Sequence, residues 1–309
     1  MIDVIAMADF AAHPKEVGPK LGGLAALAGW GYRVPDGFAV TRRAVGALAE
    51  SSERTTLPAA LAAAVGREYR ALCARLGREQ PALAVRSAAN LEDGDRRSYA
   101  GMFETVLGVL GVDQLHTAIH TCIASQRSAR VEHYGGGEPS VVMTVGVQEL
   151  IAARASGVAF SRHPVTHRDD RLVIEAVIGL GSAMIDGLAQ PDHVEVGRAD
   201  LRVLRYDVGD KERRVLVADR GGLGVEQTPA QLRQSPCLDA DDILQLSRAV
   251  VDIEGRLGRA VDVEWVIDDD GGLVIVQTRP ITSGPREARE PVRWDPVRYA
   301  RQIGGRCAD

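Results

Sequence analysis

Cysteine is scarce in this 309-residue chain, and its four copies stand far apart, at Cys73, Cys122, Cys237 and Cys307. They form no Cys-x-x-Cys unit, so the sequence suggests neither a zinc knuckle nor a dithiol redox motif, and it fits a reducing compartment. An uninterrupted apolar run of about 18 residues is also missing, as is a basic segment at the N-terminus. These absences predict a cytoplasmic protein that is neither exported nor membrane-spanning.

An excess of basic charge is lacking as well. The chain has 37 Lys and Arg residues against 42 Asp and Glu residues, and its net charge is −5. A nucleic-acid-binding surface normally needs a basic patch, so this balance predicts no nucleic-acid partner, although a local basic site can still bind a compact anion. Hydrophobic residues make up 45% of the chain, enough for a core. Helical and strand patterns are mixed without strict alternation, which favours the α+β class.

The most informative stretch is 261–280, which reads as two strands of alternating character. Its dipeptide Asp270-Gly271 strongly favours a two-residue type I′ turn, in which both central residues need positive φ. Antiparallel partners keep a constant sum of residue numbers, so the turn also sets the register. A turn at this dipeptide predicts three facing pairs: Ile267 with Val274, Glu264 with Gln277, and Asp262 with Arg279.

Asp262, Glu264, Gln277 and Arg279 share one face of this predicted hairpin. They are either ordinary cross-strand polar pairs on a solvated face, worth roughly 0.2–1 kcal/mol each, or a binding face. In the second interpretation, Glu264 and the Gln277 carbonyl are hard oxygen ligands for Mg²⁺, and the Arg279 guanidinium binds phosphate oxygens. The rest of the chain decides between the two.

Two further cations lie beside glycine or other small residues. Lys20 belongs to Gly18–Gly23, a glycine-rich turn running into a helix that ends near Gly29 or Gly31. At the start of this helix, N-terminal amides and a lysine favour a phosphate. The alternative is a plain loop and helix with a surface lysine, because the Gly-Lys-Ser/Thr of a Walker motif is missing. Arg86 ends a strand just before a polar loop. There it either reaches a ligand or forms a salt bridge with an acidic residue of that loop.

Residues 98–110 form a second glycine-containing loop that enters a strand, and a flexible backbone next to Thr105 could close over phosphates. In the helix predicted over 113–134, His116 and His120 lie on one face at i, i+4 spacing. This spacing can bind a metal, but a third ligand is not evident, so surface or interface histidines are favoured.

The segment Gly135–Pro139 is the best candidate for a boundary between two lobes. Downstream of it, 221–238 reads as an irregular linker and 239–257 as a helix with Asp239 as its N-cap. The tail 283–309 is rich in charged residues, Gly and Pro, which predicts a linker or a loosely packed extension.

Taken in order, these elements resemble the N-terminal ATP-binding domain shared by pyruvate phosphate dikinase, phosphoenolpyruvate synthase and rifampin phosphotransferase. The resemblance covers roughly residues 15–282, and five stretches carry it: Gly18–Phe38, Val85–Asp93, Ala100–Leu107, Ser156–Pro164, and Asp262–Glu264 with Gln277–Ile281. It implies an α+β, ATP-grasp-like fold of two lobes with the nucleotide bound between them. The expected divisions are an N-terminal lobe over 1–138, a C-terminal lobe over 139–282, and the tail 283–309.

The resemblance also implies roles for residues of the first lobe. Lys20 and Arg86 are similar to the pair that holds the ATP phosphates, with Arg86 near the γ-phosphoryl group during transfer. Gly101 and Thr105 match the loop that covers the triphosphate. With Arg279 of the hairpin, Lys20 and Arg86 are the expected catalytic residues.

Further implied roles fall on the second lobe and on the strand that leads into it. Gln148 and the backbone at Leu150 resemble the strand end that contacts adenine. Glu264 and Gln277 match the Mg²⁺ ligands. Arg279 matches the phosphate clamp beside them, and Asp262 the adjoining acid. The implied cofactors are therefore ATP and Mg²⁺. Phosphoryl transfer depends on positioning and charge neutralisation more than on covalent chemistry, so these residues suffice for the nucleotide half of such a reaction.

The chain departs from the family pattern in several respects. The segment Gly18-Pro-Lys-Leu-Gly-Gly keeps the lysine of the usual Gly-Gly-Lys-Gly-Ala-Asn but changes its neighbours, and Arg86-Ser-Ala-Ala-Asn lacks two hydroxyls of the usual motif. None of the seven histidines sits in the Gly-rich Ser/Thr-His setting of the family's phosphorylated histidine, and the segment after Ile281 is too short for a further domain.

Three functions follow as hypotheses. The first is a phosphotransferase module that moves a phosphoryl group from Mg·ATP to a histidine on a separate partner protein, for onward transfer to a small molecule. The second is a kinase that acts directly on a small acceptor. The third is a degenerate, non-catalytic nucleotide-binding module, which the altered lysine segment makes credible. We favour the first.

Overall fold

The computed structural model describes residues 3–49, 56–89, 105–133 and 143–281. The chain divides into two compact units, one formed by residues 1–151 with 217–223 and the other by 152–216 with 224–309. Each unit combines helices with an antiparallel sheet, so the predicted α+β class is confirmed. The predicted boundary at 138/139 precedes β5 (Met143–Glu149), whereas the units separate after Ile151, because β5 is the central strand of the first sheet.

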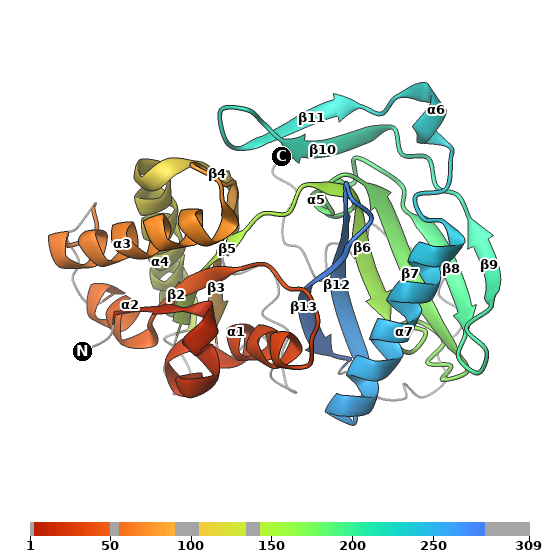
Figure 1. The fold of residues 1–309 in the computed structure, drawn as a ribbon, viewed down its shortest axis with the longest axis horizontal. Helices are drawn as coiled ribbons and strands as arrows, with labels where there is room; N and C mark the ends of the chain where they lie inside the picture. Colours follow the sequence, from red (N-terminus) through yellow and green to blue (C-terminus); the bar gives the residue numbers. More distant parts are fainter. Residues whose placement is uncertain (1–2, 50–55, 90–104, 134–142, 282–309) are drawn as a thin grey trace. The chain divides into compact units, whose positions relative to one another are not determined.

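The first unit contains a five-stranded antiparallel sheet in the order β1-β2-β5-β3-β4 (Figure 1). Its other strands are β1 (Val4–Ala6), β2 (Gly37–Val40), β3 (Leu83–Ala89) and β4 (Thr105–Val109). Its helices are η1 (Met7–Ala12), α1 (Pro14–Gly29), α2 (Arg42–Ala49), α3 (Ala59–Leu76) and α4 (Gly111–His133).

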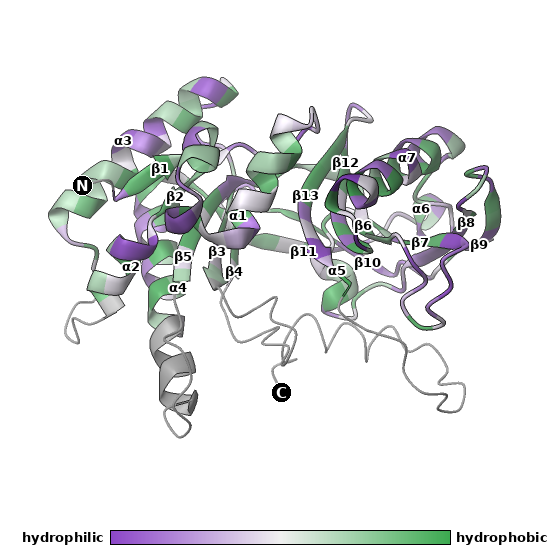
Figure 2. Ribbon diagram, turned by 90° about the horizontal axis from the view of Figure 1, so that it is seen from below, coloured by the Kyte–Doolittle hydropathy of each residue, from purple (hydrophilic) through white to green (hydrophobic). Residues whose placement is uncertain are grey.

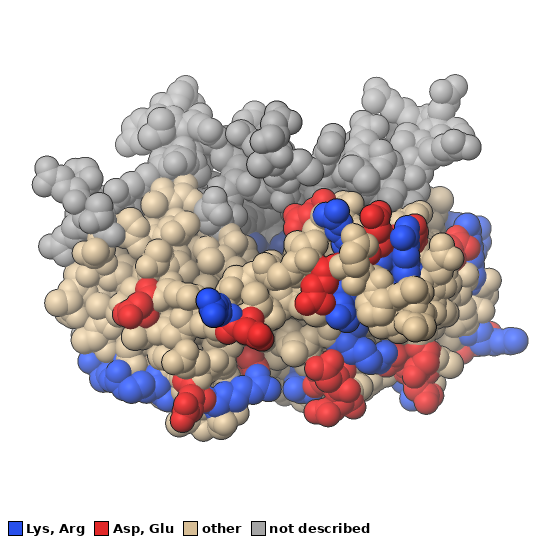
Figure 3. Space-filling model, turned by 90° about the horizontal axis from the view of Figure 1, so that it is seen from above, with Lys and Arg blue, Asp and Glu red and all other residues tan. Residues whose placement is uncertain are grey.

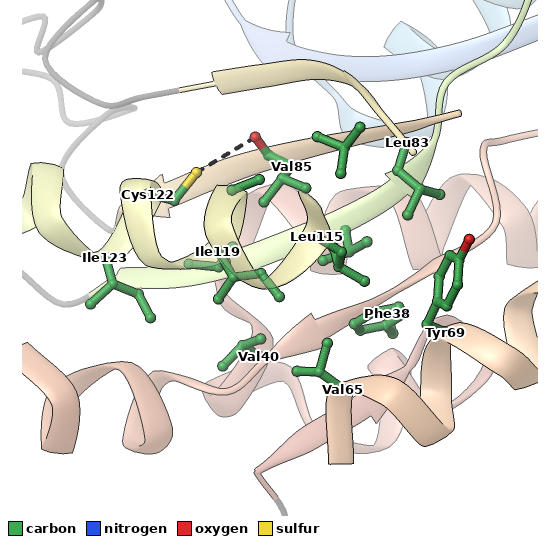
Figure 4. Close-up of a cluster of buried hydrophobic side chains, with 14 of the residues drawn as sticks. Phe38, Val40, Val65, Tyr69, Leu83, Val85, Leu115, Ile119, Cys122 and Ile123 are labelled. Carbon is green, nitrogen blue, oxygen red and sulfur yellow. Dashed lines mark hydrogen bonds between the residues drawn. The ribbon is translucent and has the colours of Figure 1, made fainter. Parts of the chain in front are cut away.

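The core of the first unit lies between one face of this sheet and helices α2, α3 and α4 (Figure 4). From β5 it takes Met143, Val145 and Val147, all nearly fully buried. The Cys122 thiol of α4 donates to the Val85 carbonyl of β3 at 3.6 Å. Since side chains alternate along a strand, the intervening residues of β5 face the other side of the sheet, where α1 packs.

The second unit contains a six-stranded antiparallel sheet in the order β13-β12-β6-β7-β8-β9 (Figure 1). The strands are β6 (Ala153–Phe160), β7 (Arg171–Ile178), β8 (Asp192–Gly197), β9 (Val203–Asp207), β12 (Val261–Asp268) and β13 (Leu273–Pro280). A four-residue helix, α5 (Ser182–Ile185), follows β7. Helix α7 (Ala240–Leu257) packs against β12, β13 and β6.

The cap of α7 follows from its sequence. Asp239 accepts from the Asp242 N–H at 2.8 Å, and the Asp242 carboxylate accepts from the Asp239 N–H at 3.1 Å, so the predicted N-cap is confirmed as part of a capping box. The helix ends at Gly258, whose φ is 65°. Apolar residues alternate with polar ones around α7 (Figure 2), and its buried side includes Ile243, Leu246, Val250 and Ile253.

The prediction of an irregular linker over 221–238 is wrong. This segment holds β11 (Leu223–Gln227), which pairs with β10 (Arg213–Val217), and a short helix, α6 (Ala230–Arg233). The connection between β10 and β11 belongs to the first unit, where the Gly222 N–H donates to the Gly108 carbonyl at 2.7 Å. A Cβ at Gly108 would meet the Gly222 carbonyl oxygen at 2.2 Å, so this approach requires glycine.

A buried ion pair joins β8 to the segment before β10. Lys211 and Asp192 are both fully buried, and their Nζ and Oδ1 atoms lie 2.5 Å apart. The Asp192 carboxylate also accepts from the Tyr206 hydroxyl at 2.8 Å and from the Cys237 N–H at 2.7 Å. These bonds compensate for the desolvation of the two charges, which is why the pair is tolerated in the core.

Charges of both signs mix on the face shown in Figure 3, where acidic and basic side chains of the described residues alternate over short distances. Among the described residues, no helix has the length and apolar character needed to span a bilayer.

Candidate functional site

The predicted pairing of the C-terminal hairpin holds, although the predicted turn is wrong. Asp262 pairs with Arg279 and Glu264 with Gln277. The strands are joined by a longer turn, in which the Asp268 N–H donates to the Gly272 carbonyl at 3.1 Å and Gly271 has a φ of 80°. This turn shifts the register by one residue, so Ile267 faces Leu273 and not Val274.

A β-bulge restores the register on the way to the polar residues. It lies between Glu264 and Trp265, where the facing residue on β13 changes from Gln277 to Ile275. The one-residue shift at the turn and the one-residue bulge cancel. The four polar residues therefore stand opposite one another as predicted.

Arg279 bonds to both predicted metal ligands. Its Nη2 atom lies 3.4 Å from Glu264 Oε1. With the Gln277 amide oriented so that its oxygen faces the guanidinium, that oxygen accepts from Arg279 Nε and, at 2.7 Å, from Nη2. A carboxylate and an amide oxygen thus converge on one cation, which is the donor chemistry that Mg²⁺ prefers. These residues fit the ion that the sequence predicts.

Asp262 lies next to the two predicted metal ligands in the hairpin. Its Oδ1 atom is buried and has no hydrogen-bond partner among the described residues. Burial and, to a smaller extent, repulsion from Glu264 raise the pKa of Asp262 to about 7, although Arg279 acts to lower it. A half-buried carboxylate with one buried, unsatisfied oxygen beside the two predicted oxygen ligands is a position that a cation would stabilise.

We predict that Asp262→Asn flattens the pH dependence of stability. The native pKa near 7 exceeds the ordinary 3.8. Between about pH 4 and 7 the native protein retains a proton that the unfolded chain releases, so metal-free stability falls as pH rises. One pKa unit corresponds to about 1.36 kcal/mol, so the variant should gain a few kcal/mol at most at pH 8 and little at pH 4.

Thermal unfolding of the metal-free protein from pH 4 to pH 8 measures this effect. Asp269→Asn, an exposed position in the same hairpin, is the matched control and should keep the wild-type profile. An unchanged slope in Asp262→Asn would show that this carboxyl does not carry the pH dependence.

In the first unit, Lys20 lies in α1 and not in an open loop. The helix is interrupted at Gly18, whose φ is 77°, and continues from Pro19, so the predicted glycine-rich turn shrinks to one residue. Gly22 and Gly23 are helical. Lys20 therefore sits in the first turn after the kink, where helix N–H groups lack intrahelical partners and favour an anion.

Arg86 lies on the sheet face that α1 covers. It pairs with Gly146 of β5 on one side and with Thr105 of β4 on the other, so Thr105 and Arg86 face each other directly in the ladder. Directly facing residues of neighbouring strands point to the same side of the sheet. The structure thus brings together two residues, Arg86 and Thr105, that the sequence assigned separately to phosphate binding.

Gln148 lies near the end of β5, and Leu150 follows the strand. The Gln148 side chain is 6% exposed, and its Nε2 atom has no hydrogen-bond partner among the described residues. A buried amide donor without a partner is a position for a polar ligand atom. The Leu150 N–H donates to the Ala82 carbonyl at 2.8 Å, so this donor is already used within the unit.

Two other predicted sites have different outcomes. Gly101, predicted in the phosphate-covering loop, lies outside the described residues. His116 Nε2 lies 3.3 Å from the Ala62 carbonyl of α3, which is the contact of an interface histidine. No cluster of three or more potential metal-ligating residues of the His, Cys, Asp and Glu types occurs in the described parts of the chain.

A polar pair that the sequence did not single out extends the hairpin's binding face. Glu264 of β12 faces Val158 of β6, which faces Glu175 of β7, which faces His193 of β8. The Glu175 carboxylate lies 2.7 Å from His193 Nδ1. Burial raises the pKa of Glu175, and this hydrogen bond raises the pKa of His193. The only signal in the sequence is an acid inside an otherwise apolar strand.

The two units therefore carry residue types that can bind phosphates or a metal. The first has Lys20 near a helix start and Arg86 opposite Gly146, and the second has oxygen ligands beside an arginine. Residues 44–296 match the family model described as pyruvate phosphate dikinase, AMP/ATP-binding domain. The match covers most of the chain. The chain belongs to this family.

Similar full-length proteins carry names of the same group. Phosphoenolpyruvate synthase of Pyrococcus furiosus is 32% identical over 243 residues, covering 75% of this chain and 30% of the relative. Phosphoenolpyruvate synthase of Aeropyrum pernix is 28% identical over 269 residues, covering 77% of this chain and 33% of the relative. Rifampicin phosphotransferase of a Streptomyces species is 37% identical over 208 residues, covering 65% and 24%. The chain thus spans a third or less of the length of these relatives.

Proposed function

We propose that the chain is an ATP-dependent phosphotransferase module of the dikinase type. It moves a phosphoryl group from Mg·ATP to a histidine on a separate partner protein, which passes the group to a small molecule. The observation that carries this proposal is the family match over residues 44–296. The basic and oxygen-ligand side chains described above in both units support it. The names of the relatives support a phosphotransferase.

The residues divide the work between holding the nucleotide and neutralising its charge. Lys20 and Arg86 bind the phosphates, and Arg86 opposes the charge on the group in transfer. Mg²⁺, held by the oxygens of Glu264 and Gln277, would neutralise phosphate oxygens when it is bound. The Arg279 guanidinium, which contacts both of these side chains, would bind phosphate oxygens. Positioning and electrostatics of this kind are what phosphoryl transfer requires of a protein.

The proposal predicts transfer that depends on a partner. The chain would be incubated with ATP labelled at the γ or the β phosphate, with and without candidate histidine-domain proteins encoded beside its gene. Acid-labile, base-stable label on the partner is the expected result, with negligible ATP turnover by the chain alone. Comparison of the two labels and the nucleotide products identifies the phosphoryl group that moves.

Two results would replace the proposal. A phosphorylated small molecule made by the chain alone would show a direct kinase. Absence of Mg·ATP binding would show a degenerate, non-catalytic module.

A further inference from the structure

The segment that carries Lys20 is fastened to β5 by one buried hydroxyl. Thr144 is 2% exposed, and its Oγ1 atom lies 3.0 Å from the Val17 carbonyl and 3.3 Å from the Ala88 carbonyl. Val17 immediately precedes the kink at Gly18, and Ala88 belongs to β3, the strand of Arg86. A single side chain therefore links the start of the lysine turn to the arginine strand.

The kink also rests directly on this hydroxyl. A Cβ built at Gly18 would lie 3.6 Å from Thr144 Oγ1, which is van der Waals contact, so the kink lies next to this hydroxyl. The φ of 77° at Gly18 is in the region that favours glycine. The kink that precedes Lys20 therefore packs against β5.

A second contact of α1 with β5 is steric. Gly146 lies two residues beyond Thr144 on the same face of the strand and is the ladder partner of Arg86. A Cβ at Gly146 would lie 2.9 Å from Leu21 Cδ2, so Leu21 occupies the space of the missing side chain. Leu21 is 4% exposed and follows Lys20 directly. The helix turn of Lys20 is thus seated on the strand position beside Arg86.

We infer that Thr144 and Gly146 are positioning residues, which hold Lys20 in a fixed relation to Arg86 so that both cations engage the phosphates of one nucleotide. The inference rests on the proposed function, because it assigns phosphate binding to the two cations. It concerns contacts inside the first unit only. The hydroxyl fixes the start of the turn, and the bare glycine sets how closely the helix approaches the sheet.

A positioning residue and a purely stabilising residue can be told apart by the ligands whose binding they affect. Misplacing Lys20 relative to Arg86 weakens binding of the triphosphate and leaves binding of the nucleoside unchanged. A loss of stability alone lowers the melting temperature without changing the preference of the folded protein for ATP over adenosine. The ratio of these two affinities therefore separates the two roles.

The first test compares Thr144→Val and Thr144→Ser with a matched control. Thr41→Val also removes a buried threonine hydroxyl from the first unit, one that accepts from the Ala44 N–H at 3.4 Å, on the N-terminal side of α2. Thr144→Val should weaken ATP binding by about five- to tenfold, the effect of one neutral hydrogen bond, with adenosine affinity unchanged. Thr144→Ser should restore ATP affinity, and Thr41→Val should lower only the melting temperature.

The second test uses the steric contact. Gly146→Ala adds the methyl group that meets Leu21, and it should lower ATP affinity while adenosine affinity stays constant. Adding Leu21→Ala to this variant makes room for the methyl group and should recover most of the lost ATP affinity. Non-additivity of this kind is expected only for residues that interact.

Hydrogen exchange over residues 19–27 supplies a readout that needs no nucleotide. Thr144→Val should speed exchange in this segment and leave α3 at the wild-type rate. Wild-type ATP affinity in Thr144→Val, or unchanged exchange in α1, would overturn the inference. If the wild-type protein does not bind ATP, the proposed function fails. Faster exchange in Thr144→Val would then still establish the hydroxyl as the anchor of α1, but its assignment to phosphate binding would fall.

Discussion

Arg86→Ala should lower the rate of phosphoryl transfer on the order of 10³-fold, with a smaller loss of ATP affinity. The reason is that a guanidinium aligned with the transferred group stabilises charge that develops mainly in the transition state. The backbone of Arg86 is held on both sides, because it pairs with Gly146 of β5 and with Thr105 of β4. This support keeps the guanidinium in place for the transfer. Single-turnover transfer to the partner histidine separates the chemical step from binding.

Arg86→Lys and Arg67→Ala make this prediction specific. The lysine variant keeps the charge but loses the planar fork, so it should recover only part of the rate. Arg67 is an exposed arginine of α3 in the same unit, and its removal should leave transfer unchanged. Wild-type transfer by Arg86→Ala would mean that the family role does not apply to this arginine.

Glu264→Gln should abolish the dependence of ATP binding on Mg²⁺ and reduce transfer by a factor on the order of 10³. The substitution removes the carboxylate that Arg279 contacts at 3.4 Å and leaves an amide of nearly the same shape. A carboxylate near phosphates repels them unless a cation lies between, so metal-free ATP should bind the variant at least as well as the wild type.

Titration calorimetry with ATP, with and without Mg²⁺, measures this prediction. Glu226→Gln is the matched control, because Glu226 is an exposed carboxylate of β11 that forms an ion pair with Arg214 of β10. The control should keep the wild-type gain in affinity on adding Mg²⁺. If Glu264→Gln also keeps that gain, Glu264 is not a ligand of the metal that accompanies the nucleotide.

The hairpin illustrates how far local patterns predict this fold. Alternation identified both strands and the polar pairs Asp262 with Arg279 and Glu264 with Gln277. The turn was misjudged, because Asp270-Gly271 also suits a longer turn with only Gly271 at positive φ. The bulge after Glu264 leaves no clear mark in the sequence. The pairing was correct because two independent one-residue shifts cancel.

The features that the sequence missed depend on long-range contacts. Lys211 and Asp192 are both fully buried and paired, and no local pattern marks these two charged residues for burial. The sequence of 221–238 predicts an irregular segment, because β11 is stabilised by pairing with β10. The residues of β10 lie earlier in the chain, in a stretch rich in charges. The helical setting of Lys20 follows from its seat on β5, whereas glycine content alone favoured an open turn.

Calorimetric titration of the wild-type chain with Mg·ATP tests the central claim most directly. The account predicts saturable binding of one ATP per chain, with an affinity that falls when Mg²⁺ is withdrawn. An absence of binding under conditions in which the protein is folded would contradict it. The chain would then be a family member that does not bind the nucleotide.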